Sequence, residues 1–474
     1  MKHMSLNEIT RACGGVYHGD SALAAREVEN VAIDSRKVEK NGLFIAVKGA
    51  RADGHSFIPQ VMENGALCAV SEHELGDVPF PYIQVESSLQ ALKDIAEHYR
   101  KSLDIKVVGI SGSVGKTSTK EMIASILSQK YCVLKTEGNY NNEIGLPLTV
   151  FNLREEHEAA VLEMGISEFG EMSRLAKVAR PDICVFTNIG FAHLESLGSR
   201  DGILKAKTEM LEYMNPEGTI IVNGDDDKLR SFQPSNGLNP VYFGLDSSFP
   251  FHAEESVSRG IEGTDAVFAT PSSTFRAHIP LPGSHMVYNA LAGIAVGLHM
   301  GLSEEELIAG IEALTPIAGR SNLIRTKRFA IIDDCYNANP ASMKASLSVL
   351  AHSGTRAIAI VGDMFELGPE EKQMHYDVGR FAAQQKINAL VCIGALSSQT
   401  AQGAREALSG AADAEQTSET AGAQNSGTRV YHFSSKEEFF ADMEHILQPG
   451  DTILVKASHG MEFSEIVERL QNEG

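Results

Sequence analysis

The strongest constraint on the fold is a short apolar strand that runs into a glycine-rich turn and then a helix. Residues 105–110 read IKVVGI, residues 111–119 read SGSVGKTST, and a helical pattern begins at Thr117. This order presents backbone N–H groups at a helix N-terminus to a phosphate chain. Lys116 is then expected to meet the β- and γ-phosphates of a nucleotide, and the Thr117 hydroxyl to ligate Mg²⁺. Binding of ATP or GTP is the strongest single inference from the sequence.

The turn is a variant of the phosphate-loop pattern. Its glycines are Gly109, Gly112 and Gly115, and Ile110 stands where the strict pattern has glycine. GKT strings also occur by chance at helix N-termini, but the strand before the turn and the helix after it favour a phosphate loop. The loop residues expected to bind the nucleotide are Gly112, Ser113, Gly115, Lys116, Thr117 and Ser118.

Short β-branched runs alternate with helical patterns along the rest of the chain. After the loop, such runs occupy residues 159–164, 182–189, 219–224, 329–334, 356–362, 388–394 and 451–458. Strands that are apolar on both faces and separated by helices indicate parallel sheets with helices on each side. The predicted fold class is therefore α/β.

Three domains are expected in a chain of 474 residues, because one domain has about 150. Helical patterns end near residues 102–104 and 315–319, which divides the chain into residues 1–103, 104–316 and 317–474. The first domain is expected to be a small α/β unit with short strands, and the second holds the phosphate loop. The segment 403–427, rich in Ala, Ser, Gly, Thr and Gln, is expected to be a flexible surface insertion.

Charge and cysteine content exclude several classes of protein. The formal net charge of −21 argues against a surface that coats nucleic acid or anionic lipid, since such surfaces need spread Lys and Arg. The six cysteines lie far apart without a CxxC pair, so we expect reduced, buried thiols and neither disulfides nor a zinc site. The N-terminus lacks an apolar signal region, and no window approaches the ~18 apolar residues of a membrane span. A cytoplasmic protein is expected.

Two polar residues follow the next strands, at the sheet edge where ligands gather in open α/β folds. Glu163 closes the run AAVLEM, and His193 follows DICVFTNIG. Taken alone, Glu163 is more simply a solvated carboxylate at a strand end, and His193 is more simply a loop histidine. Beside a phosphate loop, both become candidate magnesium ligands or phosphate contacts. By their pattern alone, Lys205 and Lys207 are lysines on a helix surface.

A series of motifs in order along nearly the whole chain resembles the Mur ligase family of ATP-dependent amide-bond-forming enzymes. The motifs are DSRKVEKNGLFIAVKGARADGHSF, GISGSVGKTSTKEM, KTEGNYNNEIGLPLTV, LEMG, FTNIGFAHLESLGS, KAKTEM, LPGSHMVYNALAG, GRSN, DDCYNANPASMKASL, GDMFELG and VKAS. The phosphate-loop variant is the form that this family uses. The resemblance implies that residues 1–103 bind a UDP-sugar-peptide and residues 104–316 bind ATP. It implies that residues 317–474 form a Rossmann-like domain that closes on ATP and binds the incoming dipeptide.

The resemblance also implies an activity. The motifs YNANP and GDMFELG, and the absence of DNPR, favour the branch that adds D-alanyl-D-alanine to UDP-N-acetylmuramoyl-tripeptide. The reaction runs through an acyl phosphate, releases ADP and phosphate, and belongs to cytoplasmic peptidoglycan precursor synthesis. The partners implied are these small molecules, with no nucleic acid, and the protein is expected to be a monomer.

Residue roles follow from the matching motifs. Lys116 and Thr117 are expected to hold phosphates and magnesium, and Glu163 and His193 to ligate two Mg²⁺ ions. Lys207 matches a lysine that family members carbamoylate to create a further anionic metal ligand. The residues expected at the nucleotide are Asn289, at the adenine, with Arg320 and Asp334. The residues expected at the substrates are Ser35, Arg36, Asp53, His55, Asn139, Asn141, Asn142, Asn337 and Asn339.

One motif departs from the family, and other functions stay open. The terminal KGSR-like motif reads Lys456, Ala457, Ser458 and His459, which leaves its role in holding the dipeptide in question. Another ligase of the family, adding glutamate to folate or a diamino acid to the muramoyl dipeptide, is one alternative. A P-loop switch protein that signals through a partner is a second, and a structural α/β protein whose loop merely packs is a third.

Overall fold

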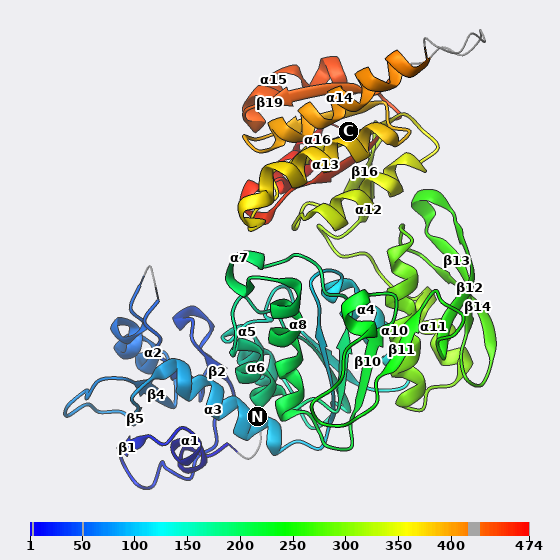
Figure 1. Cartoon of the computed structure of the whole chain (residues 1–474). Helices are drawn as coiled ribbons and strands as arrows, with labels where there is room; N and C mark the ends of the chain where they lie inside the picture. The colour runs from blue at the N-terminus through cyan, green and yellow to red at the C-terminus, as the bar shows by residue number, and fades with distance from the viewer. Residues whose placement is uncertain (2–3, 50–51, 416–426, 474) are drawn as a thin grey trace.

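The structure, a computed structural model, describes residues 1, 4–49, 52–415 and 427–473. Its strands form three sheets that follow one another along the chain. Figure 1 shows the sheet of the middle residues between the N-terminal and the C-terminal sheet. Within the described ranges, no helix is long and apolar enough to cross a membrane.

The first sheet has five strands in the order β1-β5-β4-β3-β2, antiparallel between β1 and β5 and otherwise parallel. Its strands are β1 (Val16–His18), β2 (Val31–Ala32), β3 (Leu43–Ile45), β4 (Cys68–Ser71) and β5 (Tyr82–Gln84). Its helices are α1 (Leu6–Ala12), α2 (Ile58–Glu63) and α3 (Ser88–Lys101), with the short 3₁₀ turns η1 (Ser35–Lys37) and η2 (Gly54–Phe57).

The central sheet has nine strands in the order β14-β13-β12-β11-β10-β9-β6-β8-β7. Its strands are β6 (Lys106–Ser111), β7 (Val133–Lys135), β8 (Ala159–Glu163), β9 (Ile183–Phe186), β10 (Thr219–Asn223), β11 (Val241–Gly244), β12 (Phe251–Ser258), β13 (Thr264–Ala269) and β14 (Thr274–Ile279). Its helices are α4 (Lys116–Leu127), α5 (Gly145–Val150), α6 (Glu171–Ala179), α7 (Leu194–Leu197), α8 (Arg200–Thr208), η3 (Glu209–Tyr213), α9 (Asp227–Arg230), η4 (Gly260–Glu262), α10 (His285–His299) and α11 (Glu304–Glu312).

The third sheet has six strands in the order β15-β16-β20-β17-β18-β19, of which only the β15–β16 pair is antiparallel. Its strands are β15 (Asn322–Arg325), β16 (Ala330–Asp333), β17 (Ala357–Gly362), β18 (Ala389–Ile393), β19 (Arg429–Phe433) and β20 (Thr452–Lys456). Its helices are α12 (Pro340–Ala351), η5 (Gly368–Glu370), α13 (Glu371–Gln384), α14 (Ser397–Glu415), α15 (Lys436–Ile446), η6 (His459–Met461) and α16 (Ser464–Asn472).

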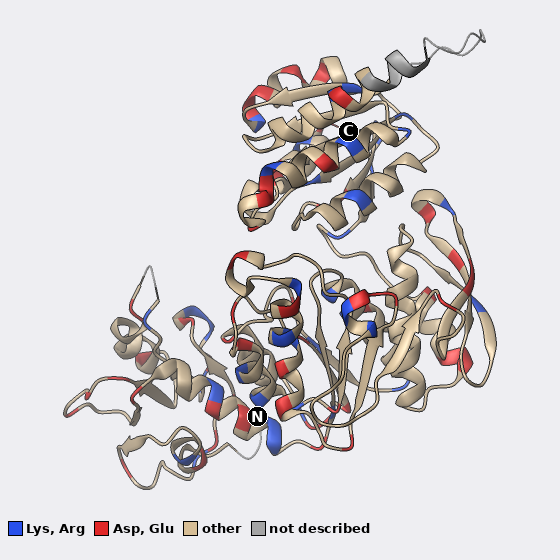
Figure 2. Cartoon of the chain, in the orientation of Figure 1, with Lys and Arg blue, Asp and Glu red and all other residues tan. Residues whose placement is uncertain are grey.

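The predicted α/β class is confirmed, and every apolar run predicted as a strand contains one. The antiparallel strands β12, β13 and β14, which extend the central sheet at one edge, were not predicted. Most of β12 is exposed, and all residues of 254–258 except Val257 are polar. Figure 2 shows charged positions along the β12–β14 extension. Antiparallel strands can leave one face in water, so they lack the continuous apolar run that marks the buried strands β8 and β9.

The prediction of a flexible insertion at residues 403–427 is wrong for residues 403–415. Helix α14 continues through residue 415, and Ala404 is fully buried. Gly403 lies so close to the Tyr376 carbonyl of α13 that a Cβ there would overlap it. The small residues that suggest a linker are thus the ones that let two helices approach closely. Residues 416–426 lie outside the described part of the chain.

The expectation of six buried, reduced cysteines is correct in part. All six are free thiols, and Cys68, Cys184, Cys335 and Cys392 are buried. Cys13 is half-buried and Cys132 is exposed, because Cys132 lies just before the edge strand β7 rather than within a buried strand.

Each sheet with its helices is called a body below: the first, the central and the third body. Helix α3 joins the first body to the central body. One apolar cluster includes Leu92 and Ile95 of α3 together with Leu146 and Val150 of α5. The Tyr99 hydroxyl donates a 2.6 Å hydrogen bond to the Leu153 carbonyl. The first two sheets therefore share a continuous core, which fixes how the first sheet sits against the central one.

Arg100 closes the end of this junction. Its buried guanidinium donates to the carbonyls of Ala179, Leu103 and Ile105 at 3.1–3.2 Å. Asp182 lies 3.9 Å from the guanidinium. Three backbone carbonyls, of which that of Leu103 is part-buried and the other two are buried, thus depend on one side chain.

We expect the Arg100→Met variant to lose about 3 kcal/mol of unfolding free energy, because three backbone carbonyls, two of them buried, lose a charged donor. Urea denaturation followed by circular dichroism measures the change. Lys101→Met is the matched control, since the Lys101 side chain is 47% exposed in its pair with Glu97 and such pairs contribute about 0.5 kcal/mol. Equal losses in the two variants would contradict the assigned role of Arg100.

The central and third bodies touch at the turn between β12 and β13. Ile261 of η4 packs against the apolar cluster of the third sheet. Glu262 forms an ion pair with Arg325 of β15. In Figure 1 the β12–β14 extension reaches toward α12. This contact seats the third body over the edge of the central sheet that carries the phosphate loop.

Candidate active site

A cavity of about 830 Å³ lies between the phosphate loop, the segment after β9 and the third body. The predicted site residues that line it come from these three segments and from the chain after β7, the end of β8 and α10: Ser113, Gly115, Lys116, Thr117, Ser118, Asn141, Asn142, Glu163, His193, Asn289, Arg320, Asp334, Asn337 and Asn339. Other predicted residues lie elsewhere in the fold. The cavity therefore joins segments about 200 residues apart in sequence.

The phosphate loop has the backbone that its glycines predict. Gly112 packs so tightly on the Thr187 hydroxyl that any Cβ would overlap it. Gly115, with φ of 84°, has the left-handed conformation and stands directly before α4. Lys116 begins that helix, and its Nζ donates to the Gly112 carbonyl at 2.8 Å. The loop is thus closed on itself, with the N-terminus of α4 toward the cavity.

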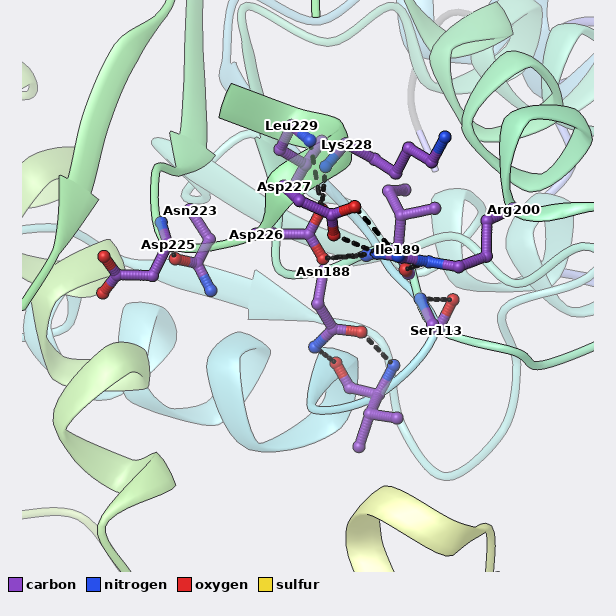
Figure 3. Close-up of polar contacts among 12 residues, drawn as sticks. Ser113, Asn188, Ile189, Arg200, Asn223, Asp225, Asp226, Asp227, Lys228 and Leu229 are labelled. Atoms are coloured by element: carbon purple, nitrogen blue, oxygen red, sulfur yellow. Dashed lines mark hydrogen bonds and ion pairs between the residues drawn. The ribbon is translucent and has the colours of Figure 1, made fainter. Parts of the chain in front are cut away.

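Asn188 clamps the loop to the end of β9, as Figure 3 shows. Its side-chain oxygen accepts from the Val114 N–H at 3.0 Å, and its amide donates to the Val114 carbonyl at 2.9 Å. The Asn188 carbonyl accepts from the Ser113 N–H at 3.0 Å. The Ser113 hydroxyl accepts from the Gly190 N–H at 2.9 Å. The two loops therefore behave as one rigid unit.

A second layer fixes the chain that leads to His193. The Asp226 carboxylate accepts from the N–H of Ile189 at 2.8 Å and caps α9 through the N–H of Lys228 and Leu229. Arg200 donates to the Ile189 carbonyl at 2.8 Å and pairs with Asp227. These contacts appear in Figure 3. The peptide groups on both sides of Ile189 are thus held from α8 and α9.

Glu163 ends β8 inside the cavity with one oxygen available. Its Oε1 accepts from the Asn141 amide at 2.8 Å. Its Oε2 is buried with no hydrogen-bond partner within the described chain. A buried carboxylate oxygen without a partner is costly unless a cation or water meets it. The position fits a hard cation such as Mg²⁺, which takes carboxylate, hydroxyl, phosphate and water oxygens.

Lys120 and Thr136 support Glu163 from behind, and sequence reasoning missed both. The Glu163 N–H donates to the Thr136 hydroxyl at 3.0 Å. The buried Lys120 ammonium donates to the Thr136 carbonyl at 2.5 Å. Helix α4 thus fixes the segment that continues to Asn141.

The interpretation of Lys207 as a surface lysine is wrong. Only 1% of Lys207 is exposed, whereas Lys205 is exposed on the same helix. Burial lowers the pKa of Lys207 well below its usual value, and the nearby positive charge of Lys116 lowers it further. Burial and the charge of Lys207 also lower the pKa of His193. Burial among these groups therefore shifts the Lys207 equilibrium toward the neutral amine.

The third body contributes cationic and aromatic groups. Arg320 lies over the Tyr336 ring at 4.0 Å and donates to the Thr117 hydroxyl at 3.3 Å. Asn289 belongs to α10 of the central body, and its side-chain oxygen accepts from the Thr119 hydroxyl at 2.9 Å. Arg320 thus approaches the start of α4, where a phosphate chain would lie.

Asp334 lines the cavity, but its carboxylate already has three partners. Oδ1 accepts from the Ser321 N–H at 3.1 Å, and Oδ2 accepts from the Ser346 hydroxyl and the Lys456 ammonium at 2.6 and 2.7 Å. Lys456, of the altered terminal motif, also donates to the Asn337 carbonyl at 2.9 Å. In this structure Asp334 and Lys456 order the turn that carries Tyr336 and Asn337.

The predicted substrate residues of the first body do not line this cavity. Arg36 pairs with Asp34, and its side chain is 86% exposed. Asp53 accepts from the His55 ring at 2.7 Å, and His55 in turn accepts from the Glu72 N–H. Ser35 lies in η1, and Asn139 precedes the cavity residue Asn141. The structure leaves a second site on the first body as a prediction.

Comparison with known proteins matches three segments of the chain to domains of one family. Residues 27–100, 110–297 and 319–459 match the domains described as "Mur ligase family, catalytic domain", "Mur ligase middle domain" and "Mur ligase, glutamate ligase domain". The UDP-N-acetylmuramoyl-tripeptide–D-alanyl-D-alanine ligase of Bacillus subtilis is 37% identical over 94% of this chain and 93% of its own.

Two solved structures are also similar along nearly their whole length. A crystal structure of MurF from Acinetobacter baumannii has a TM-score of 0.88 and 30% identity, and covers 99% of both chains. The MurF ligase of Thermotoga maritima in complex with ADP has a TM-score of 0.80 and 28% identity, and covers 94% of this chain and 97% of that one.

The fold and the cavity define a three-body α/β protein whose phosphate loop faces residues of its own C-terminal sheet. The chain belongs to the Mur ligase family.

We expect Asn188→Ala to raise KM for ATP about tenfold, because the loop loses paired hydrogen bonds at Val114. Steady-state kinetics with ATP as the varied substrate measures this. Asn152→Ala, an exposed asparagine outside the cavity, is the control and should match the wild type. An unchanged KM in Asn188→Ala would show that the clamp does not shape the nucleotide site.

Proposed function

We propose that this protein is an ATP-dependent ligase that adds D-alanyl-D-alanine to UDP-N-acetylmuramoyl-tripeptide, in cytoplasmic peptidoglycan precursor synthesis. The observation that carries the proposal is one cavity that joins a phosphate loop to the C-terminal sheet. It occurs in a chain that matches the Bacillus subtilis tripeptide–D-alanyl-D-alanine ligase over 94% of its residues. The ADP complex of the Thermotoga relative supports ATP as the nucleotide.

The chemistry follows from the uphill cost of making an amide in water. A carboxylate oxygen of the tripeptide attacks the γ-phosphorus of ATP, giving an acyl phosphate and ADP. The free amine of D-alanyl-D-alanine then attacks the acyl carbon, and inorganic phosphate leaves from a tetrahedral intermediate. The chain supplies position and charge rather than a covalent nucleophile.

The first step brings a carboxylate against a polyanion. Two unit charges at 4 Å repel by about 4 kcal/mol at an effective dielectric constant of ~20. Lys116 offsets this repulsion, and Arg320 reaches the same end of α4 from the third body. The N–H groups at the start of α4 add further positive potential. These are the interactions that strengthen as charge moves to the transferred phosphoryl group.

Thr117, Glu163 and His193 would hold Mg²⁺, for which the partnerless Glu163 oxygen is the best support. Bound Mg²⁺ supplies charge neutralisation for the phosphates. We propose two ions, with Lys207 carbamoylated as a further ligand. The lowered pKa of Lys207 favours the neutral amine, which is the form that adds CO₂ to give a carbamate.

The three bodies would divide the work. Residues 1–103 hold the UDP-sugar-peptide through Ser35, Arg36, Asp53 and His55, residues 104–316 hold ATP, and residues 317–474 close on it. Asn139 and Asn142 would lie toward the acceptor, and Asn337 and Asn339 toward the dipeptide. Closure excludes water, which would hydrolyse the acyl phosphate. We propose that the protein acts as a monomer.

The direct test is phosphate release from Mg²⁺-ATP with UDP-N-acetylmuramoyl-tripeptide, with and without D-alanyl-D-alanine, and with the product mass measured. We expect release that needs both substrates and a product heavier by one dipeptide residue. Lys116→Ala should lose at least about 1,000-fold in kcat, because it removes a cation that stabilises the transition state. Release without any acceptor would favour a nucleotide switch instead.

The Lys207 carbamate has its own test. Lys207→Ala should abolish turnover, and short carboxylates such as acetate should restore part of it by replacing the lost oxygen ligand. Lys205→Ala, on the exposed side of the same helix, should keep full activity. Full activity of Lys207→Ala would refute the carbamate hypothesis.

A further inference from the structure

Glu366 extends from the third body toward the central body at the cavity. It follows β17 in the turn before η5, and its backbone is left-handed, with φ of 61°. Its side chain is 70% exposed, and its Oε2 lies 3.2 Å from Nδ1 of His193. His193 and the next residue, Leu367, both line the cavity. The carboxylate thus lies at the cavity edge between the two bodies.

The turn that carries Glu366 is fixed by its other residues. The Asp363 carboxylate accepts from the Ser397 N–H and hydroxyl, both at 2.7 Å. The Met364 N–H donates to His375, and the Phe365 N–H donates to the Ser458 hydroxyl, both at 2.9 Å. A left-handed non-glycine residue persists only where the surroundings impose it. The turn therefore presents Glu366 in one direction.

The acids that line the cavity are already engaged. Asp334 accepts from Lys456 and Ser346, and Asp226 accepts from three backbone N–H groups. Glu171 accepts from the Ser167 N–H, and Glu163 is the proposed magnesium ligand. Within the described chain, His193 is the one polar partner of Glu366. Of the acidic groups at the cavity, the Glu366 carboxylate therefore has the fewest contacts to give up when a ligand binds it.

The incoming dipeptide carries an ammonium group at the end that reacts. It must approach a region that holds the cations Lys116, Arg320 and Lys456. A carboxylate partner holds an ammonium in one position through charge-assisted hydrogen bonds. The ammonium then loses a proton to water, and its nitrogen attacks as the free amine. Glu366 faces the segment 189–193, beside the phosphate loop where the acyl phosphate would form.

We propose that Glu366 binds the ammonium group of the incoming dipeptide and so selects an amine as the second substrate. This role rests on the proposed function, and it deepens it by naming the group that recognises the nucleophile. Ammonium binding would replace the contact of Glu366 with His193. His193 would then be available as a ligand for Mg²⁺. Glu366 is thus a substrate-binding residue supplied by the third body only when that body lies over the central sheet.

The test is the steady-state kinetics of E366Q, which keeps the shape and removes the charge. We expect KM for D-alanyl-D-alanine to rise about tenfold, as a charged hydrogen bond is lost, with KM for ATP and for the UDP-substrate changed less than about twofold. The analogue with a hydroxyl in place of the reacting amine should inhibit E366Q and the wild type with the same Ki, since it carries no ammonium.

Two further variants complete the comparison. E370Q makes the same charge change at an exposed position four residues away and should leave every KM unchanged. E366D, which keeps the charge on a shorter side chain, should give a KM for the dipeptide between those of the wild type and E366Q.

An unchanged KM for the dipeptide in E366Q, or a raised Mg²⁺ requirement in its place, would overturn the assigned role. An equal rise in Ki for the hydroxyl analogue would do the same, because it would point to a loss of shape rather than of charge. A wild-type protein that makes no ligation product would refute the proposed function and the role of Glu366 with it. A wild-type ligase whose E366Q variant keeps its KM would refute the role of Glu366 alone.

Discussion

The contact between the phosphate loop and the segment after β9 is the interaction on which the site depends. Asn188 exchanges two hydrogen bonds with Val114, and Ser113 and Gly190 add two more between the same segments. One rigid unit thereby sets the direction of Lys116 at the start of α4 and of the chain toward His193. Preorganised donors of this kind need no rearrangement when charge develops.

The remaining parts of the cavity are assembled on this unit from two directions. Helix α4 holds Lys120 against Thr136, and the Thr136 hydroxyl accepts from the Glu163 N–H. One carboxylate oxygen of Glu163 has no hydrogen-bond partner among the residues that the structure describes. The third body contacts the central body at two places. Ile261 of the central body packs against an apolar cluster of the third body, and Glu366 of the third body contacts His193 of the central body. Arg320 crosses between the bodies to Thr117. A reaction that passes through a water-sensitive acyl phosphate benefits from a cavity completed by a separate body.

The sequence predicts the local parts of this arrangement well. The strand, the glycines and the helix start of the phosphate loop lie within 14 consecutive residues, 105–118, so they are recognised together. The buried parallel strands are recognised as continuous apolar runs. Asn188 could not be found this way, because its partner Val114 lies 74 residues away. Lys207 and residues 403–415 of α14 were misjudged for a related reason. Burial depends on which helix packs against the segment, and neither a lysine nor a run of small residues reveals that. The family resemblance supplied the proposed role of Lys207, which composition and spacing left open.

The central claim is that the substrate carboxylate takes the γ-phosphoryl group before the amide forms. The measurement that tests it most directly uses tripeptide substrate with ¹⁸O in its terminal carboxylate, followed by mass analysis of the released inorganic phosphate. An acyl-phosphate route transfers one ¹⁸O from the carboxylate to each phosphate, because the bond that breaks when the amine attacks joins the acyl carbon to that oxygen. Phosphate without ¹⁸O, released together with amide product, would contradict the account.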